Sequence, residues 1–279
     1  MIRLSYFIRK RADLSDGDFR ALWLERHAAL VAGRASALRI RRHVQSLVLP
    51  EDPVAQMLQQ IYATGGQPYD GVAHFWWKSA EDLEEALTTA EGRQAADALA
   101  EDERGFVDFS RSLLGFGMEL PQINPPEDIV AKEGTTILKG YYVGNVRSGL
   151  SLQAAKFHWI TCHGPLAREY QQFLPYRRYI QVHALGLPLA ARMREARKGM
   201  PEAPSFIGHA EVWADRRDLA LATGPEVGQA FQLLSADIHT FVDSAAASVF
   251  VAKEYVVVDK PIMVPPLPQP AAHTNLPST

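Results

Sequence analysis

The chain has 279 residues, of which 47% are hydrophobic and 22% charged, and its net charge is −3. These proportions are ordinary for a folded soluble protein, and a nearly neutral chain lacks the broad basic surface that nucleic-acid binding requires. A chain of this length predicts two units, each able to bury a core of its own.

The first residues and the single cysteine bear on where the protein works. Residues 1–11, MIRLSYFIRKR, alternate apolar and polar positions, so they predict a strand rather than a secretory signal. No run of about 18 apolar residues occurs, so no membrane span is expected. Cys162 is the only cysteine, which excludes an intrachain disulfide and a multi-cysteine zinc site and favours a reducing, cytoplasmic setting.

The sequence contains one pattern twice. A shift of 136 positions places Trp23 on Trp159 and His27 on His163. Shifts of 135 to 137 positions align further pairs in the same order along the chain: Tyr6 with Tyr142, Ser15 with Ser151, Arg42 with Arg178, Gln45 with Gln181, Gly71 with Gly208, Trp76 with Trp213, and Asp108 with Asp243. Collinear matches of this kind indicate an internal repeat.

Both copies predict the same order of elements. The first copy predicts a strand at 2–9, a helix from Ser15 to about His27, strands at 42–49 and 71–78, one or two helices over 80–113, and a strand at 114–120. The second predicts a strand at 137–144, a helix from Ser151 to about His163, strands at 178–185 and 207–214, helices over 216–247, and a strand at 249–258. Strands follow from alternating apolar residues, and each serine is a helix N-cap.

This order, β-α-β-β-α-β, is the ferredoxin-like split unit of an α+β fold. One face of each sheet is covered by helices, so two tandem units can close their open faces against each other as an intramolecular dimeric α+β barrel. The predicted domains are residues 1–122 and 136–259, with an exposed linker at 123–135 and a proline-rich tail at 260–279.

Six segments carry the pattern that the copies share. The first copy contains LSDGDFRALWLERHAAL, YDGVAHFWWKSAEDLEEAL and DERGFVDF, and the second contains LSLQAAKFHWITCHGPL, FIGHAEVWADRRDLAL and DIHTFVDS. These segments resemble the EthD-like family of the dimeric α+β barrel superfamily, over nearly the whole chain except linker and tail. The resemblance implies a pocket between sheet and helices that handles a hydrophobic, often aromatic, compound by acid/base chemistry without metal or organic cofactor.

Candidate catalytic residues are those that can exchange protons near neutral pH. His27 and His163 are the strongest, because the same residue recurs at the same helix position and agrees with the family pattern. Their alternative role is structural, as caps on the last carbonyls of a helix. Strand residues two apart share a face, which adds further candidates: His43, His74, Tyr179, His183, His209 and Glu211. Glu211 has the spacing to orient His209.

Other residues are candidates for substrate binding. Trp76 and Trp213 can form flat walls for an aromatic ring, and Tyr6 and Tyr142 can donate a phenolic hydrogen bond to an oxyanion. Arg178 can pair with a carboxylate, although a solvated position at the start of a strand is the favoured interpretation.

Metal, nucleophile and nucleotide sites are disfavoured. His158 and His163 are five residues apart, which places them on different faces of a regular helix, and no HExxH occurs. Cys162 adjoins His163, but neighbours in a helix point apart, so a plain thiol is expected. No glycine-rich phosphate loop is present.

The predicted function is a cofactor-independent lyase, isomerase or cyclase that uses histidine acid/base chemistry on a hydrophobic aromatic or polyketide-like small molecule. The copies differ at His43/Tyr179 and at His74/Glu211, so one pocket is expected to be active, and the second copy is favoured. A cofactor-independent monooxygenase of phenolic compounds and a non-catalytic ligand-binding accessory protein are the alternatives. A monomer and a homodimer are both compatible, and neither nucleic acid nor membrane is an expected partner.

Overall fold

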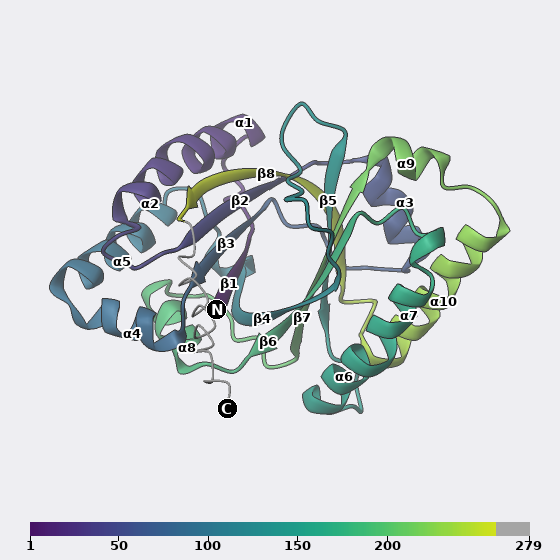
Figure 1. The fold of residues 1–279 in the computed structure, drawn as a ribbon. Coiled ribbons are helices and arrows are strands. Elements are labelled where there is room, and N and C mark those ends of the chain that lie inside the picture. Colours follow the sequence, from purple (N-terminus) through teal and green to yellow (C-terminus); the bar gives the residue numbers. More distant parts are fainter. Residues whose placement is uncertain (261–279) are drawn as a thin grey trace, which may run out of the picture.

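Eight antiparallel strands close into a barrel in the computed structural model, which describes residues 1–260 (Figure 1). The strands are β1 (Ile2–Ile8), β2 (Arg42–Val48), β3 (Gly71–Trp77), β4 (Leu113–Ile123), β5 (Ile137–Asn145), β6 (Arg178–Leu185), β7 (Phe206–Asp215) and β8 (Ser248–Asp259). Their order around the barrel is β1-β3-β2-β8-β5-β7-β6-β4. The predicted strands are therefore confirmed to within a few residues.

Helices cover the outside of the barrel (Figure 1). They are α1 (Asp16–Arg20), α2 (Ala28–Arg34), α3 (Pro53–Ile61), α4 (Ala80–Thr88), α5 (Ala90–Glu103), α6 (Leu152–His158), α7 (Gly164–Glu169), α8 (Pro188–Ala196), α9 (Arg216–Leu221) and α10 (Pro225–Phe241). Two π-helical turns, η1 (Ala21–His27) and η3 (Trp159–His163), join α1 to α2 and α6 to α7, and short 3-10 turns lie at η2 (Phe109–Arg111) and η4 (Gln171–Phe173). Ser15 and Ser151 accept the predicted N-cap hydrogen bonds from Asp18 and Ala154.

The two halves of the chain have equivalent strand orders. The first half is ordered β4-β1-β3-β2 and the second β8-β5-β7-β6, and contacts between β2 and β8 and between β4 and β6 close the barrel. The fold is thus α+β, with the inner faces of both sheets turned toward the barrel interior.

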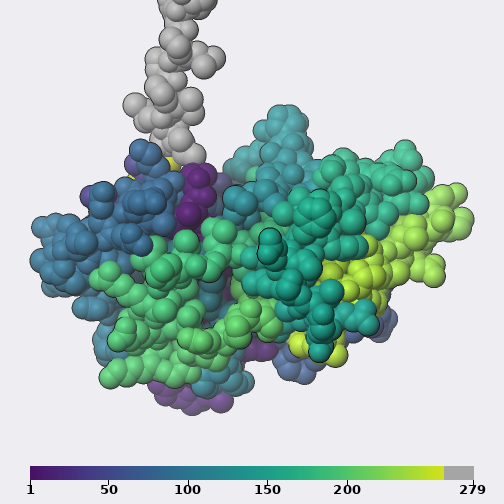
Figure 2. Space-filling model, turned by 90° about the horizontal axis from the view of Figure 1, so that it is seen from below, coloured from purple at the N-terminus to yellow at the C-terminus, as the bar shows by residue number. Residues whose placement is uncertain are grey.

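Each half sends an arm across the other half. Helix α3 follows β2 but places Leu58 and Tyr62 in the core around Trp159. Helix α8 follows β6 but places Leu189 in the core around Trp23, and Figure 2 shows the α8 region lying against the first half. These two arms lie in connections for which the sequence pattern predicted no helix.

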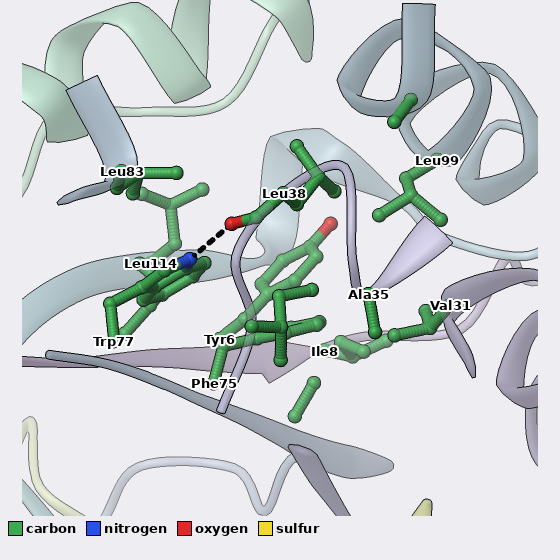
Figure 3. Packing of buried hydrophobic residues seen from close by; sticks show 14 of the residues in the cluster. Tyr6, Ile8, Val31, Ala35, Leu38, Phe75, Trp77, Leu83, Leu99 and Leu114 are labelled. Carbon is green, nitrogen blue, oxygen red and sulfur yellow. Dashed lines mark hydrogen bonds between the residues drawn. The ribbon is translucent and has the colours of Figure 1, made fainter. Parts of the chain in front are cut away.

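Apolar side chains between helices and sheet form the core of the first half (Figure 3). Trp77 lies in this core and its indole Nε1 donates to the carbonyl oxygen of Leu38 at 2.7 Å. Trp23 and Trp159 are buried in the two cores, Trp23 in the first half and Trp159 in the second.

The linker expected at residues 123–135 is not a freely exposed segment. Ile123 is the last residue of β4, and Ala131 is fully buried. The Ala131 amide donates to the Glu254 carboxylate at 2.9 Å, and the Glu254 amide donates back to the Ala131 carbonyl at 2.8 Å. Most residues of the segment are exposed, as the prolines and the polar run predicted, and these hydrogen bonds fasten it to β8. Beyond Lys260, the predicted tail lies outside the described residues.

None of the helices within residues 1–260 has the length and apolar character needed to cross a membrane.

Candidate functional site

The helices that carry His27 and His163 do not end at these histidines. The amide of Ala28 donates to the Trp23 carbonyl, and that of Gly164 donates to the Trp159 carbonyl, which are the i to i−5 bonds of a π turn. The helices then continue through α2 and α7. The alternative role of these histidines as caps of the last carbonyls is therefore wrong.

Each of the two histidines is buried and bonded to a carboxylate. His27 Nδ1 lies 2.9 Å from Asp102 Oδ2, and His163 Nδ1 lies 2.8 Å from Asp237 Oδ2. Burial opposes ionisation of Asp237, but hydrogen bonds from His163 and His158 hold its pKa below the usual value. Because an ionised carboxylate only accepts, Nδ1 donates and Nε2 is the nitrogen left to act as a base.

His158 and His163 share Asp237, contrary to the expectation that they face apart. His158 Nε2 lies 2.8 Å from Asp237 Oδ1. In a regular α-helix, residues five apart lie on different faces. The π turn at Trp159–His163 instead brings His158 and His163 onto one face. In the first half the second oxygen of Asp102 pairs with Arg26 instead, at 2.9 Å.

Asp102 and Asp237 are not among the residues predicted from the sequence. Both open quoted segments, DERGFVDF and DIHTFVDS, and they align at the same 135-residue shift as Asp108 and Asp243. This repeat could have identified the two aspartates, because an acid and a histidine that both recur in the two copies are candidates for a hydrogen-bonded pair.

His163 lines a cavity of about 70 Å³ between the outer face of the second sheet and the helices. The walls are mostly apolar and come from β5, β6, β7, β8, α7, α9, α10 and the α3 arm, and they include Val54, Leu58, Leu138, Gly140, Ala210, Val212, Ala214, Leu219, Leu234, Ile238, Val249 and Val251. We call this space the His163 cavity. Its walls draw on both predicted domains, since the α3 arm belongs to the first.

Five tyrosines line the His163 cavity: Tyr62, Tyr141, Tyr142, Tyr176 and Tyr179. Burial raises the pKa of each, that of Tyr176 to about 12. These phenols therefore remain protonated at neutral pH and can donate hydrogen bonds but not accept a proton. Of the predicted residues, the cavity unites His163, Tyr142 and Tyr179. Tyr62 and Tyr176 were not predicted, and their hydroxyl oxygens lie 3.2 Å apart.

The first half carries bulkier side chains at the positions that line the His163 cavity in the second half. Leu4, Phe75 and Trp77 occupy the strand positions that Gly140, Val212 and Ala214 occupy in the second half. A hollow of about 170 Å³ remains between these side chains and α4, α5 and α8, and neither His27 nor Tyr6 lines it. Tyr6 instead lies beside Arg197, whose guanidinium carbon is 5.4 Å from the ring centre.

The remaining candidates divide between the two faces of the sheet. His74 pairs across the sheet with Val44, and His209 with Val182, whereas His43 pairs with Phe75. Opposed residues of an antiparallel pair share a face, so His74 and His209 face the barrel interior and His43 the helices. By the same alternation, Glu211, Trp76 and Trp213 face the interior, and Tyr179 and His183 face the helices. The candidate residues are therefore divided between the barrel interior and the space under the helices.

Glu211 is the centre of a charged network in the barrel interior. It accepts from Arg3 Nη1 at 2.9 Å and lies 3.1 Å from Lys139 Nζ. Burial opposes its ionisation, but the charges of Arg3 and Lys139 hold its pKa well below the usual value. His74 Nε2 lies 3.1 Å from Glu211 and His209 Nε2 lies 3.4 Å away, without hydrogen-bond geometry for His209. Glu211 thus approaches both histidines rather than orienting His209 alone.

The donor atoms of His74, His209 and Glu211 lie within 4.8 Å of one another, a separation that could suit a metal ion. However, Arg3 and Lys139 already occupy the carboxylate of Glu211. A divalent cation would have to displace or approach two buried positive charges, which is electrostatically costly. The donor set is therefore a poor fit for a cation.

His43 and His183 lie in the core and do not line the His163 cavity. The His43 ring stacks on Phe75 with centroids 4.0 Å apart, and its Nδ1 lies 2.9 Å from the His74 carbonyl oxygen. The His183 ring lies 4.2 Å from that of Trp159. Burial lowers the pKa of His43 to about 3 and that of His183 to about 4. Both are packing residues at neutral pH.

The buried histidines make stability depend on pH. Burial also lowers the pKa of His209 to about 4 and that of His74 well below its usual value. The unfolded chain binds protons at these groups below about pH 6.5 and the folded chain does not, so stability falls as pH is lowered. Each group contributes up to about 1.4 kcal/mol per pH unit.

Urea unfolding between pH 7.5 and 5.5 is expected to show this loss as a falling midpoint. His43→Phe keeps the ring stacked on Phe75 but removes one titrating group, so its midpoint should fall less over the same interval. An equally steep fall in the variant would contradict the assignment to His43.

Residues 11–110 match the family described as the EthD domain. No curated protein matches the chain. Among solved structures, a Fusobacterium nucleatum protein provisionally named a monooxygenase is 5% identical, with 91% of this chain and 93% of that chain covered and a TM-score of 0.51. One from Lactobacillus acidophilus with the same provisional name is 8% identical, with 95% and 98% covered and a TM-score of 0.47. A dye-decolorizing peroxidase from Bacteroides thetaiotaomicron is 7% identical, with 90% and 92% covered and a TM-score of 0.45. The likeness to the Fusobacterium nucleatum structure concerns the fold alone.

Proposed function

Since the chain carries an EthD domain at residues 11–110, we propose that it is a fusion of two EthD-like units in which the second unit holds the active site. The equivalent strand orders of the two halves support the fusion. The repeated π turns and the repeated histidine–aspartate pairs support it as well. His163 lines a cavity, whereas His27 does not line the hollow beside the first sheet, and this difference supports activity in the second unit.

The proposed reaction begins with proton abstraction by His163. Nε2 would take a proton from an acidic C–H or O–H of the substrate, and Asp237 would stabilise the imidazolium through Nδ1–H. The protonated phenols of Tyr62, Tyr142 and Tyr176 could donate to the oxygen that becomes negative. The apolar walls favour a small hydrophobic substrate and exclude water from the charged groups.

The observation that carries this proposal is a histidine, bonded through Nδ1 to Asp237, that lines a mostly apolar cavity. Exchange of substrate protons for deuterium in D2O, followed by NMR over a panel of phenols and aromatic β-keto compounds, tests it directly. Exchange that depends on His163 supports a lyase, isomerase or cyclase. No exchange and no product with any compound that binds the cavity would favour a ligand-binding accessory protein.

A cofactor-independent monooxygenase is the second candidate, since a phenolate formed by the same proton abstraction could react with oxygen. The provisional name of the Fusobacterium nucleatum structure favours considering it. Oxygen consumption with the same panel separates this activity from proton transfer alone.

Filling the cavity should abolish turnover without unfolding the protein. A Cβ at Gly140 would meet only the Val212 carbonyl oxygen, at 3.7 Å, so Gly140→Leu introduces bulk into the cavity without a backbone clash. Leucine already stands at the equivalent position, Leu4. We expect turnover to fall at least about tenfold, since misfit in a packed site costs about 1–3 kcal/mol. Gly140→Ala is the matched control and should retain most activity; unchanged turnover in Gly140→Leu would place the reaction elsewhere.

A further inference from the structure

One end of the barrel opens into a second, charged cavity of about 380 Å³, which we call the barrel mouth. It is lined by Met1, Arg3, Arg41, Arg42, Val44, Trp76, Glu119, Lys139, Arg178, Ile180, Glu211, Trp213, Glu254, Asp259 and Lys260. It shares no lining residue with the His163 cavity. What it binds is therefore a question separate from the reaction proposed above.

Two cations that line the barrel mouth, Arg3 and Lys139, are already paired with carboxylates. Arg3 Nη1 donates to Glu119 Oε1 at 2.7 Å, and the Trp76 indole donates to the same oxygen at 2.9 Å. The second half repeats this arrangement, with Lys139 Nζ 3.0 Å from Glu254 Oε1 and the Trp213 indole 2.8 Å from Glu254 Oε2. Glu211 links the two sets through Arg3 and Lys139. These fixed pairs hold the two tryptophans in place.

Two equivalent arginines lie beside the tryptophans, on the strands opposite those that carry Arg3 and Lys139. Arg42 pairs across the sheet with Trp76 and Arg178 with Trp213, and their guanidinium carbons lie 5.5 and 5.0 Å from the respective indole centres. Each Nε is buried without a hydrogen-bond partner within residues 1–260. The nearest carboxylate to Arg178 is the exposed Asp128, at 3.9 Å, and Arg42 forms no ion pair in the described part of the chain.

The lining carries more positive than negative charge. It contains six lysine or arginine side chains, namely Arg3, Arg41, Arg42, Lys139, Arg178 and Lys260, against the four carboxylates of Glu119, Glu211, Glu254 and Asp259. Six minus four leaves a net charge of +2 in a protein whose total is −3. A concave site of this sign concentrates anions from solution.

We propose that the barrel mouth binds a small dicarboxylate, with one carboxylate on Arg42 and the other on Arg178. Guanidinium groups match carboxylates through two parallel N–H donors, and stacking on tryptophan orients each fork. Arg42 on β2 and Arg178 on β6 line the same cavity, so a ligand with a carboxylate at each end can pair with both. A monocarboxylate uses only one.

Isothermal titration calorimetry of the full chain with malonate, succinate and glutarate, against propionate as the monocarboxylate, tests the proposal. At least one dicarboxylate should bind about tenfold more tightly than propionate, since each bidentate pair is a strong charge-assisted contact. Arg42→Gln and Arg178→Gln should each reduce that affinity about tenfold, to the level of propionate. Arg177→Gln is the matched control and should leave it unchanged, because Arg177 pairs with Asp215 and Asp218 outside the barrel mouth.

Two further measurements keep the test decisive. If a glutamine variant does not fold, Arg42→Lys retains the charge but not the fork, and it should bind the dicarboxylate more weakly than the unmodified protein. His163→Ala should leave the dissociation constant unchanged, which separates this site from the proposed active site. Equal affinities for propionate and every dicarboxylate, or full affinity in both Arg42→Gln and Arg178→Gln, would overturn the proposal.

Discussion

Replacing His163 with alanine is expected to lower kcat about 10²–10⁴-fold, the usual contribution of a positioned general base. His27→Ala is a matched control, because His27 is equally buried and bonded to Asp102 in the same way. His27 does not line an equivalent cavity, so its variant should retain the activity of the folded protein. The difference between the two variants therefore isolates the chemical role from the structural one.

The carboxylates provide a second comparison in the same experiment. Asp237→Asn removes the charge that stabilises an imidazolium, so kcat should fall, whereas Asp102→Asn should leave kcat unchanged. Turnover is measured with the compound that shows deuterium exchange or oxygen consumption, and circular dichroism checks folding. Equal losses in His163→Ala and His27→Ala would contradict an active site in the second half.

The strands and the helix starts could be predicted from the sequence because their determinants are local. Alternating apolar residues predicted the strands, and Ser15 and Ser151 predicted the helix starts. The internal repeat predicted the same order of elements in both halves. The helix ends could not be predicted, because the α-helical period gives no sign of a π turn. Helices α3 and α8 were missed because each packs on the other half, and their apolar residues match a surface distant in sequence.

The candidate site was predictable only in part. Residue type and repetition identified His163 and Tyr142, but the face on which each strand residue lies depends on sheet register. His74 and His43 were both reasonable candidates by residue type, and only the pairing of His74 with Val44 places them on opposite faces. Asp237, the acid that orients His163, could have been identified only by aligning the short segments that precede the last strand of each half.

Replacing Glu103 with alanine is expected to destabilise the protein by about 3–5 kcal/mol, because it leaves a buried charge without a partner. Arg197 donates to both oxygens of Glu103, at 2.5 and 2.6 Å. Glu103 ends α5 of the first half and Arg197 follows α8 of the second, so this pair fastens the α8 arm. Glu101→Ala is the matched control, since Glu101 is exposed and its pair with Arg104 should contribute less than about 1 kcal/mol.

A double variant distinguishes loss of the ion pair from loss of packing. The second half has Ile238 at the position equivalent to Glu103, which shows that an apolar side chain suits this helix position. Glu103→Ile combined with Arg197→Met replaces both charges with apolar side chains, and such exchanges of buried pairs are often neutral or stabilising. Urea unfolding at pH 7.5 should therefore show a large loss for Glu103→Ala and recovery of most of it in the double variant. A double variant as unstable as Glu103→Ala would mean that the α8 arm depends on the hydrogen bonds themselves rather than on charge balance.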